Sequence, residues 1–335
     1  MSSSLLIAGL AAVTLASSLH PYEAVEPHMG TLFRIKLYAT DQDQAQHAFR
    51  AAFDRVAALD DTLSDYKPDS ELNRLCRNAV QHPIKVSDDL FRVISASEKL
   101  SQNSDGAFDI TIGPLTHLWR EARKSNHLPD KVAVQEAGAR CGFRKLHIDQ
   151  AQHTVELDQP GMQLDVGGIA KGYAADEALM VLSKSGIRSA LVAASGDLAF
   201  SDPPPGERGW KIGVDSLDRF DAAFTRVLLL SNGAVSTSGP SEQHLDANGA
   251  RYSHIIDPQT ETGLSQPISV TIVARHGIES DGISTAVSVL GAQRGLAFVE
   301  HQPGIAALIM TRKGDLVRIM ESSRFRLLPE THVNQ

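Results

Sequence analysis

Two hydrophobic periods alternate along the first part of the chain. Every second residue between 32 and 38 is apolar, which predicts a half-buried strand. From residue 44 onward the apolar positions recur every three or four residues and predict an amphipathic helix, with a stripe of Phe49, Ala52, Phe53, Val56, Leu59 and Leu63. A second helix is expected over residues 88–101, ending near Asn103.

The rest of the chain mixes short strand-like runs with helical ones. A helix is predicted over 169–185, where Gly186 stops it, and strands are predicted at 145–149, 154–158, 162–165, 189–194, 210–214, 224–231, 268–274, 305–311 and 315–322. Arg312-Lys313-Gly314 joins the last two strands as a hairpin turn, so antiparallel neighbours should dominate. We therefore predict an α+β fold, with helices covering largely antiparallel sheets, in a single domain over residues 25–330.

Composition and charge narrow the function. The 335 residues are 42% hydrophobic, enough for a large core, and the net charge of -8 without any Lys/Arg run argues against nucleic-acid binding. Cys76 and Cys141 lack zinc-site spacing, and a bridge between them stays open. Residues 5–15 are apolar and small residues follow, so residues 1–20 are interpreted as an export leader, with a simple N-terminal extension as the alternative.

The segment 164–176 carries the strongest chemical signal. Gly167 and Gly168 precede a predicted helix, and Lys171 adds a positive charge in its first turn. Adjacent glycines allow close approach of a ligand, and the start of a helix offers unpaired N–H groups, so this arrangement suits a diphosphate. Neither the P-loop nor the G-x-G-x-x-G spacing is present. The alternative is a tight turn whose glycines serve packing alone.

Other candidates are weaker when taken singly. Asp281 and Thr285 are four residues apart on a predicted helix, and oxygen ligands of this kind suit Mg²⁺, although an N-cap and a back-bonded Thr would look the same. His254 could donate to a phosphate or accept a proton, or be structural. The segment 106–115 ends in a Gly-Pro turn and could lie against a flat ring or enter a strand, while 195–197 and 236–239 look like turns at strand ends.

Taken in order, these segments resemble the ApbE family of FAD:protein FMN transferases. The matching segments are Met29-Gly30-Thr31, Leu63-Ser64-Asp65-Tyr66, Ser70-Glu71-Leu72, 106–115, 165–176, Thr237-Ser238-Gly239, 254–258 and 281–285. The resemblance implies a fold related to the T-fold and a Mg²⁺-dependent enzyme of the bacterial envelope. Such an enzyme transfers the FMN half of FAD to a threonine or serine hydroxyl of an acceptor protein and releases AMP. The leader would allow association with a membrane.

The resemblance also implies roles for individual residues. The positions at which the family contacts FAD are Met29, Ala107, Phe108, Asp109, Asp165, Lys171 and Ile255. Gly168, through its carbonyl, and Asp281 and Thr285 fall on the metal. We assign catalytic roles to Lys171, Asp281 and His254, with His254 also contacting the FAD phosphate, because a cation and a metal can offset the charge that develops on the diphosphate.

The chain departs from the family pattern at three places. Glu261 stands where a glycine usually follows the His-Ile-Ile-Asp-Pro-x-Thr run, Ser195-Gly196-Asp197 replaces Gly-Gly-Glu, and Gly282-Ile283-Ser284 replaces an alanine-rich run. None of them removes an expected ligand. Two further hypotheses therefore stay open, a Mg²⁺-dependent FAD pyrophosphatase and an exported FAD-binding protein without turnover.

Overall fold

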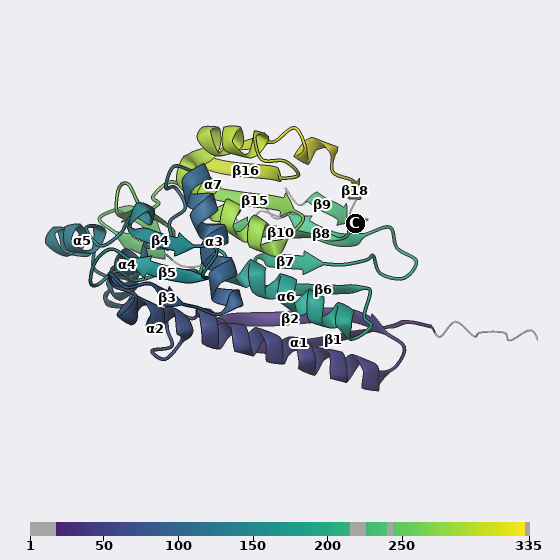
Figure 1. The fold of residues 1–335 in the computed structure, drawn as a ribbon. Helices are drawn as coiled ribbons and strands as arrows, with labels where there is room; N and C mark the ends of the chain where they lie inside the picture. The colour runs from purple at the N-terminus through teal and green to yellow at the C-terminus, as the bar shows by residue number, and fades with distance from the viewer. Residues whose placement is uncertain (1–17, 215–225, 240–243, 332–335) are drawn as a thin grey trace, which may run out of the picture.

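A large antiparallel sheet forms the centre of the molecule. The computed structural model describes residues 18–214, 226–239 and 244–331, and the predicted leader lies outside this part up to residue 17. The sheet has eight described strands, in the order β1 (His20–His28), β2 (Thr31–Ala39), β6 (Ala190–Ala194), β7 (Asp197–Phe200), β10 (Gly233–Ser238), β15 (Ile268–Ala274), β16 (Ala306–Lys313) and β17 (Leu316–Glu321). Each pairs antiparallel with its neighbours (Figure 1).

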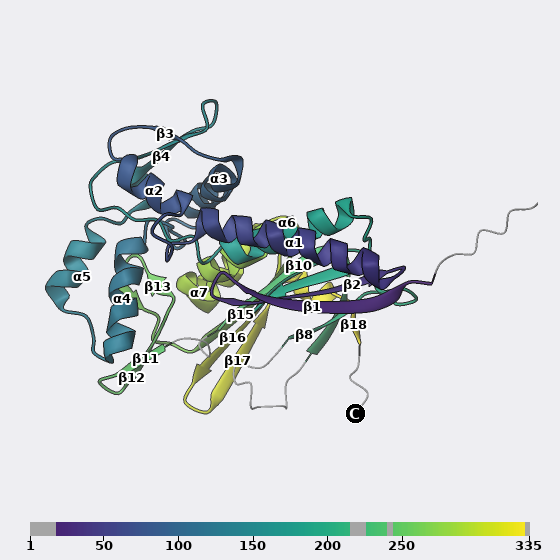
Figure 2. The same cartoon turned by 90° about the horizontal axis from the view of Figure 1, so that it is seen from below.

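Both faces of this sheet are covered. One face carries α1 (Gln42–Leu63), α6 (Ala170–Lys184) and α7 (Gly277–Glu300), with α3 (Asp88–Asn103) packed over α1 and α7. A small sheet of β8 (Trp210–Val214), β9 (Arg226–Leu230) and β18 (Glu330–Thr331) lies on the other face (Figure 2). All seven residues of β15 are buried as a result. Val270 and Ile272 pack with the α7 side, and Val273 packs with β8 and β9. Because both faces of β15 are covered, its residues do not alternate between buried and exposed positions.

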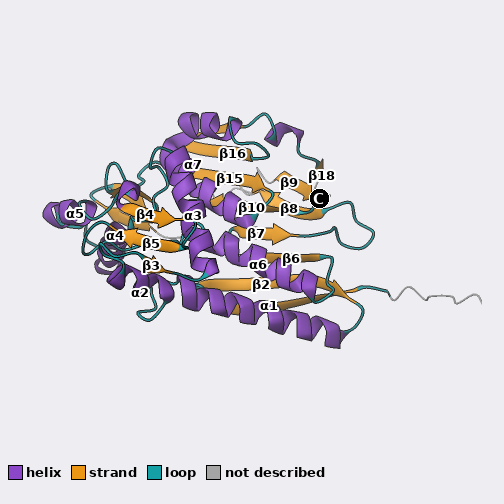
Figure 3. Ribbon diagram, in the orientation of Figure 1, coloured by secondary structure: helices purple, strands orange, loops and turns teal. Residues whose placement is uncertain are grey.

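A smaller lobe closes one end of the sheet. It contains α2 (Glu71–Asn78), β3 (Ile84–Lys85), α4 (Gly113–Ser125), α5 (Lys131–Gly138), β4 (Leu146–Asp149), β5 (Thr154–Leu157), β11 (His244–Ala247), β12 (Ala250–Ser253), β13 (Ile256–Asp257) and β14 (Thr262–Gly263) (Figure 3). Leu115 and Trp119 of α4 pack with Leu245 and Ile256 of the hairpins in a separate apolar cluster. The lobe therefore brings residues near 115 and 250 together.

The predicted fold class is confirmed, and so are most of its elements. The strand at 32–38, the helices from 44 and over 88–101 and 169–185, the strands near 146, 155, 190, 210 and 270, and the final hairpin all form. The last two strands are joined at Gly314, between the paired Lys313 and Leu316. The predicted strand 224–231 corresponds to β9, and residues 224–225 lie outside the described part.

Three predictions were wrong. Residues 162–165 form no strand. Their backbone contacts the segment 110–112 through an isolated bridge between Gln163 and Ile112 and a hydrogen bond from the Asp165 N–H to the Ile110 carbonyl, and these do not extend into a ladder. The Gly-Pro pair at 113–114 starts α4 instead of closing a turn, since proline suits the first turn of a helix. Residues 236–238 lie inside β10. Several further elements were not predicted: the helices α2, α4 and α5 and the strands β1, β3, β7, β11, β12, β13, β14 and β18.

The cysteines and the described helices complete the picture. Cys76 and Cys141 are separate buried thiols, and burial raises the pKa of Cys76 to about 11 and that of Cys141 to about 12. Both thiols therefore stay protonated at neutral pH. Among the helices of the described residues, none has the length and apolar character needed to cross a membrane.

Candidate functional site

The first turns of α6 and α7 meet in direct backbone contact. A Cβ on Gly172 would lie 2.0 Å from the carbonyl oxygen of Gly277, so these positions allow the two helices to touch. Asp176 of α6 then caps α7, because its carboxylate accepts the N–H groups of Gly277 at 2.7 Å and Ile278 at 3.0 Å. The Gly-Gly segment at the start of α6 is thus fixed against the start of α7.

Asp281 lies at this contact, deep in the protein. It is 3% exposed, and its Oδ2 accepts the N–H of Gly172 at 2.9 Å. Lys171 Nζ lies 3.8 Å from the same oxygen and 3.2 Å from Oδ2 of the buried Asp197, and it donates to the Gly167 carbonyl at 3.0 Å. Two buried carboxylates therefore share one ammonium. Burial, followed by the charge of Asp197, raises the pKa of Asp281 to about 7.

The three predicted metal ligands come together here. A Cβ on Gly168 would lie 3.0 Å from Thr285 Oγ1, and Thr285 follows Asp281 by one helical turn on α7. In the described part of the chain no group of three or more His, Cys, Asp or Glu side chains could hold a metal. A carbonyl, a carboxylate and a hydroxyl nevertheless fit Mg²⁺, which accepts few protein oxygens when phosphates supply others. The excess negative charge of the buried acids also favours a cation.

The segment 106–109 borders the same place. The Phe108 ring lies 3.5 Å from where a Cβ of Gly168 would be, and Ala107 and Phe108 are both buried. The Asp109 carboxylate is fully engaged: it accepts from the N–H and hydroxyl of Thr111 at 2.8 and 2.6 Å and from the N–H of Phe143 at 2.9 Å. Burial nevertheless raises its pKa. Its side chain thus holds the loop that presents Phe108 to Gly168.

The remaining predicted residues lie on separate elements. Met29 forms the β1–β2 turn at a φ of 50° with Gly30 at 73°, and it packs against the main core. His254 and Ile255 connect β12 with β13. Leu264 fixes the backbone around His254, because its carbonyl accepts from Ser253 at 2.8 Å and its N–H donates to Ile255 at 2.9 Å. Contacts thus bring Gly168, Lys171, Asp281, Thr285 and Phe108 together, whereas Met29, His254 and Ile255 lie on other elements of the fold.

Sequence reasoning missed three charged residues near the site. Asp197 directly follows the two-residue turn between β6 and β7 and contacts Lys171; its place in Ser195-Gly196-Asp197, where the family usually has Gly-Gly-Glu, was a usable signal. Arg120 of α4 donates to both Asp65 and Asp165. Asp65 belongs to a segment that matches the family, which was a usable signal, but the pattern around Arg120 gave none.

Glu261 stands where the family usually has glycine, and its backbone adopts a conformation that glycine favours. The turn near His254 therefore keeps the shape that a glycine would give it. Glu261 adopts a φ of 60°, the left-handed region in which side chains are uncommon. Its N–H donates to the Asp257 carbonyl at 2.8 Å, and its own carbonyl accepts from the Trp119 indole at 3.0 Å. These bonds hold the turn despite the unfavourable conformation of the residue.

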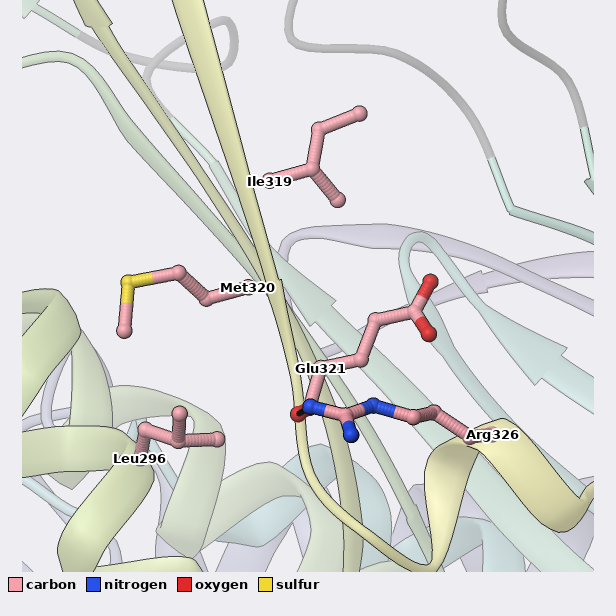
Figure 4. A pocket seen from close by; sticks show the side chains of 5 residues that line it. All are labelled: Leu296, Ile319, Met320, Glu321 and Arg326. Atoms are coloured by element: carbon pink, nitrogen blue, oxygen red, sulfur yellow. Dashed lines mark hydrogen bonds between the residues drawn. The ribbon is translucent and has the colours of Figure 1, made fainter.

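Two hollows lie away from this constellation. One, of about 360 Å³, lies between Leu296 of α7 and the residues Ile319, Met320, Glu321 and Arg326 near β17 (Figure 4). A wider one, of about 680 Å³, is bordered by α3, α6 and α7, and includes Ile169 and Ile283. These two residues are sequence neighbours of Gly168 and Asp281, but the chemistry described above does not face this groove.

Comparison with known proteins agrees with this geometry. The sequence pattern of the ApbE family matches residues 29–309. The chain belongs to the ApbE family. Relatives of this ApbE protein include the FAD:protein FMN transferases of Salmonella typhimurium, 29% identical over 89% of this chain and 86% of the relative, and of Treponema pallidum, 31% identical over 86% and 84%.

Solved structures of flavin transferases have the same fold as this ApbE protein. The flavin transferase ApbE from Vibrio cholerae superposes with a TM-score of 0.84 at 27% identity, covering 93% of this chain and all of that one. The apo form of the Pseudomonas stutzeri flavinyl transferase ApbE gives a TM-score of 0.82 at 29% identity, with 94% and 98% covered. The likeness therefore extends over both the sheet and the lobe.

Proposed function

We propose that this chain is a Mg²⁺-dependent FAD:protein FMN transferase, which moves FMN from FAD to a threonine or serine hydroxyl of an acceptor protein. The observation that carries the proposal is the meeting of Lys171, Gly168, Asp281 and Thr285 at the touching starts of α6 and α7. Membership of the ApbE family and the FAD:protein FMN transferases among its relatives supply the substrate and the reaction.

The residues of the chain divide the work between binding and charge. The carbonyl of Gly168, the carboxylate of Asp281 and the hydroxyl of Thr285 would hold Mg²⁺. When bound, the ion would withdraw charge from the diphosphate and stabilise AMP as the leaving group. Lys171 and the N–H groups at the start of α6 attract the diphosphate, and Lys171 offsets negative charge that develops during transfer.

The transfer exchanges one phosphorus–oxygen bond for another. The acceptor hydroxyl oxygen forms a bond to the phosphorus of the FMN half, and the bond from that phosphorus to the bridging oxygen breaks. AMP departs with the bridging oxygen, and FMN stays on the acceptor through a phosphodiester. His254 takes the hydroxyl proton or orients the phosphate, and neither role requires a covalent intermediate with the enzyme.

The proposal includes a cellular location for the enzyme. The apolar run of residues 5–15, with the small residues after it, supports export to the periplasm or cell envelope of a bacterium and association with the membrane through this segment. The acceptor would then be a protein that exposes its flavinylation motif in the same compartment.

One incubation separates the transferase from its alternatives. The protein is mixed with FAD, Mg²⁺ and an acceptor carrying a flavinylation-type Thr/Ser motif, and the acceptor lacking the target hydroxyl serves as the control. Transfer gives flavin fluorescence that stays with the denatured acceptor, together with an equal amount of AMP. Free FMN plus AMP in both samples would identify a pyrophosphatase, and unchanged FAD would identify a binding protein, so either result overturns the proposal.

A further inference from the structure

Arg120 bridges two carboxylates that come from distant parts of the chain. Its guanidinium donates through Nη1 to Asp65 Oδ2 and through Nη2 to Asp165 Oδ2, the latter at 3.0 Å. The arginine side chain is 18% exposed and each carboxylate is 10% exposed, so the three charges are largely removed from water. Removing one partner of a largely buried ion pair costs more stability than removing one partner of a surface pair, because the remaining charge is left uncompensated away from water.

The surroundings fix the orientation of the guanidinium. The Tyr66 ring lies 4.2 Å from Arg120 Cζ, in a cation–π contact, and His117 Nε2 lies 3.6 Å from Asp65. Burial tends to raise the pKa of Asp65, but the nearby His117 and the charge and hydrogen bond of Arg120 outweigh it and keep the pKa below its usual value. The pKa of Arg120 is raised by Asp165 and Asp65 despite its burial. Asp65 and Arg120 are therefore both charged at neutral pH.

The second oxygen of Asp165 connects this bridge to the site. Asp165 Oδ1 accepts the N–H of Gly167 at 2.8 Å, and the next residue, Gly168, lies against Thr285. A carboxylate that is fixed on one side by Arg120 thus shapes the turn that carries a proposed metal ligand on the other. A carboxylate without a partner at this position would also repel an anionic ligand.

We propose that Arg120 is a positioning residue of the transferase. By bridging Asp65 and Asp165 it holds the Gly167–Gly168 turn in place and neutralises the carboxylate that fixes this turn, so that an anionic dinucleotide can bind there. This inference rests on the proposed function for the identity of the ligand. It assigns Arg120 an effect on binding, not on the chemical step, because its contacts reach the site only through Asp165.

Three variants and a matched control test the inference. Arg120→Met removes the charge and keeps much of the apolar stem, and Arg120→Lys keeps a charge that cannot bridge two carboxylates in the same way. Asp65→Asn with Arg120→Met also removes one of the two carboxylates whose pairing with Arg120 is lost. Arg188→Met is the control, because Arg188 pairs with Asp202 on the surface at 3.2 Å beyond the far end of α6. The dissociation constant of FAD is measured by flavin fluorescence with Mg²⁺ present, and KM, kcat and Tm are measured on the same samples.

The expected pattern separates positioning from simple stabilisation. Arg120→Met should raise the FAD dissociation constant and KM by about 10- to 100-fold, the scale for losing a charged hydrogen bond, while kcat changes by less than about threefold. Arg120→Lys should recover part of the loss, the double variant should bind FAD more tightly than Arg120→Met, and Arg188→Met should match the wild type.

Two results would overturn the inference. One is unchanged FAD binding and KM in Arg120→Met. The other is a fall in kcat and Tm without recovery of FAD binding in the Lys and double variants, which would mark the bridge as purely structural. The binding measurement does not require transfer. If the wild type bound FAD without transferring FMN, the proposed function would fail while the Arg120 inference could still be judged.

Discussion

Gly172→Ala tests whether the contact between α6 and α7 builds the site. The added Cβ would lie 2.0 Å from the carbonyl oxygen of Gly277, 2.5 Å from its carbon and 2.7 Å from the Asp281 Cβ. Real Cβ atoms essentially never approach other heavy atoms closer than 3.0 Å. Because the nearest atoms belong to the backbone of a helix, no change of side-chain rotamer relieves the clash, and the two helices must move apart.

The size of the effect follows from two opposing contributions. Replacing glycine by alanine inside a helix favours folding by about 1 kcal/mol, whereas overpacking a dense contact costs about 1–3 kcal/mol. We expect the upper end here, so the free energy of unfolding should fall by about 2 kcal/mol, which is roughly 4 °C in Tm for a chain of this size. Separation also lengthens the 2.9 Å bond from the Gly172 N–H to Asp281 and should weaken Mg²⁺ binding.

Thermal unfolding and the Mg²⁺ dependence of FAD turnover are the measurements. Gly213→Ala is the matched control, because Gly213 lies in β8 with nothing within 4 Å of an added Cβ. That variant should unfold within about 0.5 kcal/mol of the wild type and need the same Mg²⁺ concentration. If Gly172→Ala were as stable as the wild type with an unchanged Mg²⁺ requirement, the touching of α6 and α7 would not be what positions Asp281.

Three further predictions concern single side chains. Asp281→Ala should abolish Mg²⁺-dependent turnover while the free energy of unfolding changes by about 1 kcal/mol or less, because the lost hydrogen bond is offset by the relief of a buried charge; full activity would reject the metal assignment. His254→Ala should slow transfer by about 100-fold, and a normal rate across pH would exclude a role as base. Asp65 has a lowered pKa, so its ionised form stabilises the fold above about pH 4. Denaturation of wild type and Asp65→Asn should therefore show a stability difference that is full at pH 7 and shrinks below pH 4, and a difference that grows with acid would contradict the assigned pairing.

Periodicity predicted the elements that bury one face. The stripe from Phe49 to Leu63 and the alternation at 32–38 were sufficient to predict α1 and β2, because both elements bury their apolar residues in the main core. The helix α4 has a similar stripe in Leu115, Trp119 and Ala122. It was missed because its Gly-Pro start looks like a turn, although proline at the first turn of a helix costs no hydrogen bond.

Small hydroxyl residues led to a different error, because a segment of a strand was predicted to be a turn. Ser236 and Ser238 look like turn residues because serine competes locally for backbone bonds. In the structure they lie in β10 and bond Ser280 at 2.8 Å and Ser284 at 2.7 Å, both on α7. Their partners are more than forty residues away in sequence, so no local pattern could predict this strand.

The residues of the candidate site also differ in whether a local sequence pattern could predict them. The segments around Gly168 and Asp281 contain their own signals, the adjacent glycines and the spacing of a carboxylate and a hydroxyl along one helix. Asp197 carries only the resemblance of its segment to the family motif, and Arg120 has no such signal, since it becomes part of the site through its contact with Asp165. A sequence thus shows which residues carry reactive groups, whereas the fold decides which charges face them.

That charge balance also supports the proposed combination of a divalent cation with an anionic dinucleotide. Asp65, Asp165, Asp197 and Asp281 lie with Lys171 and Arg120 beside the start of α6, so the carboxylates outnumber the cations by two. A diphosphate brought to this place alone would meet a site of its own sign. A divalent cation at Asp281 would cancel that excess, and the phosphates would supply the oxygens that the protein lacks. Each ligand would therefore favour the other, and this mutual dependence would follow from the placement of buried acids and not from any single motif.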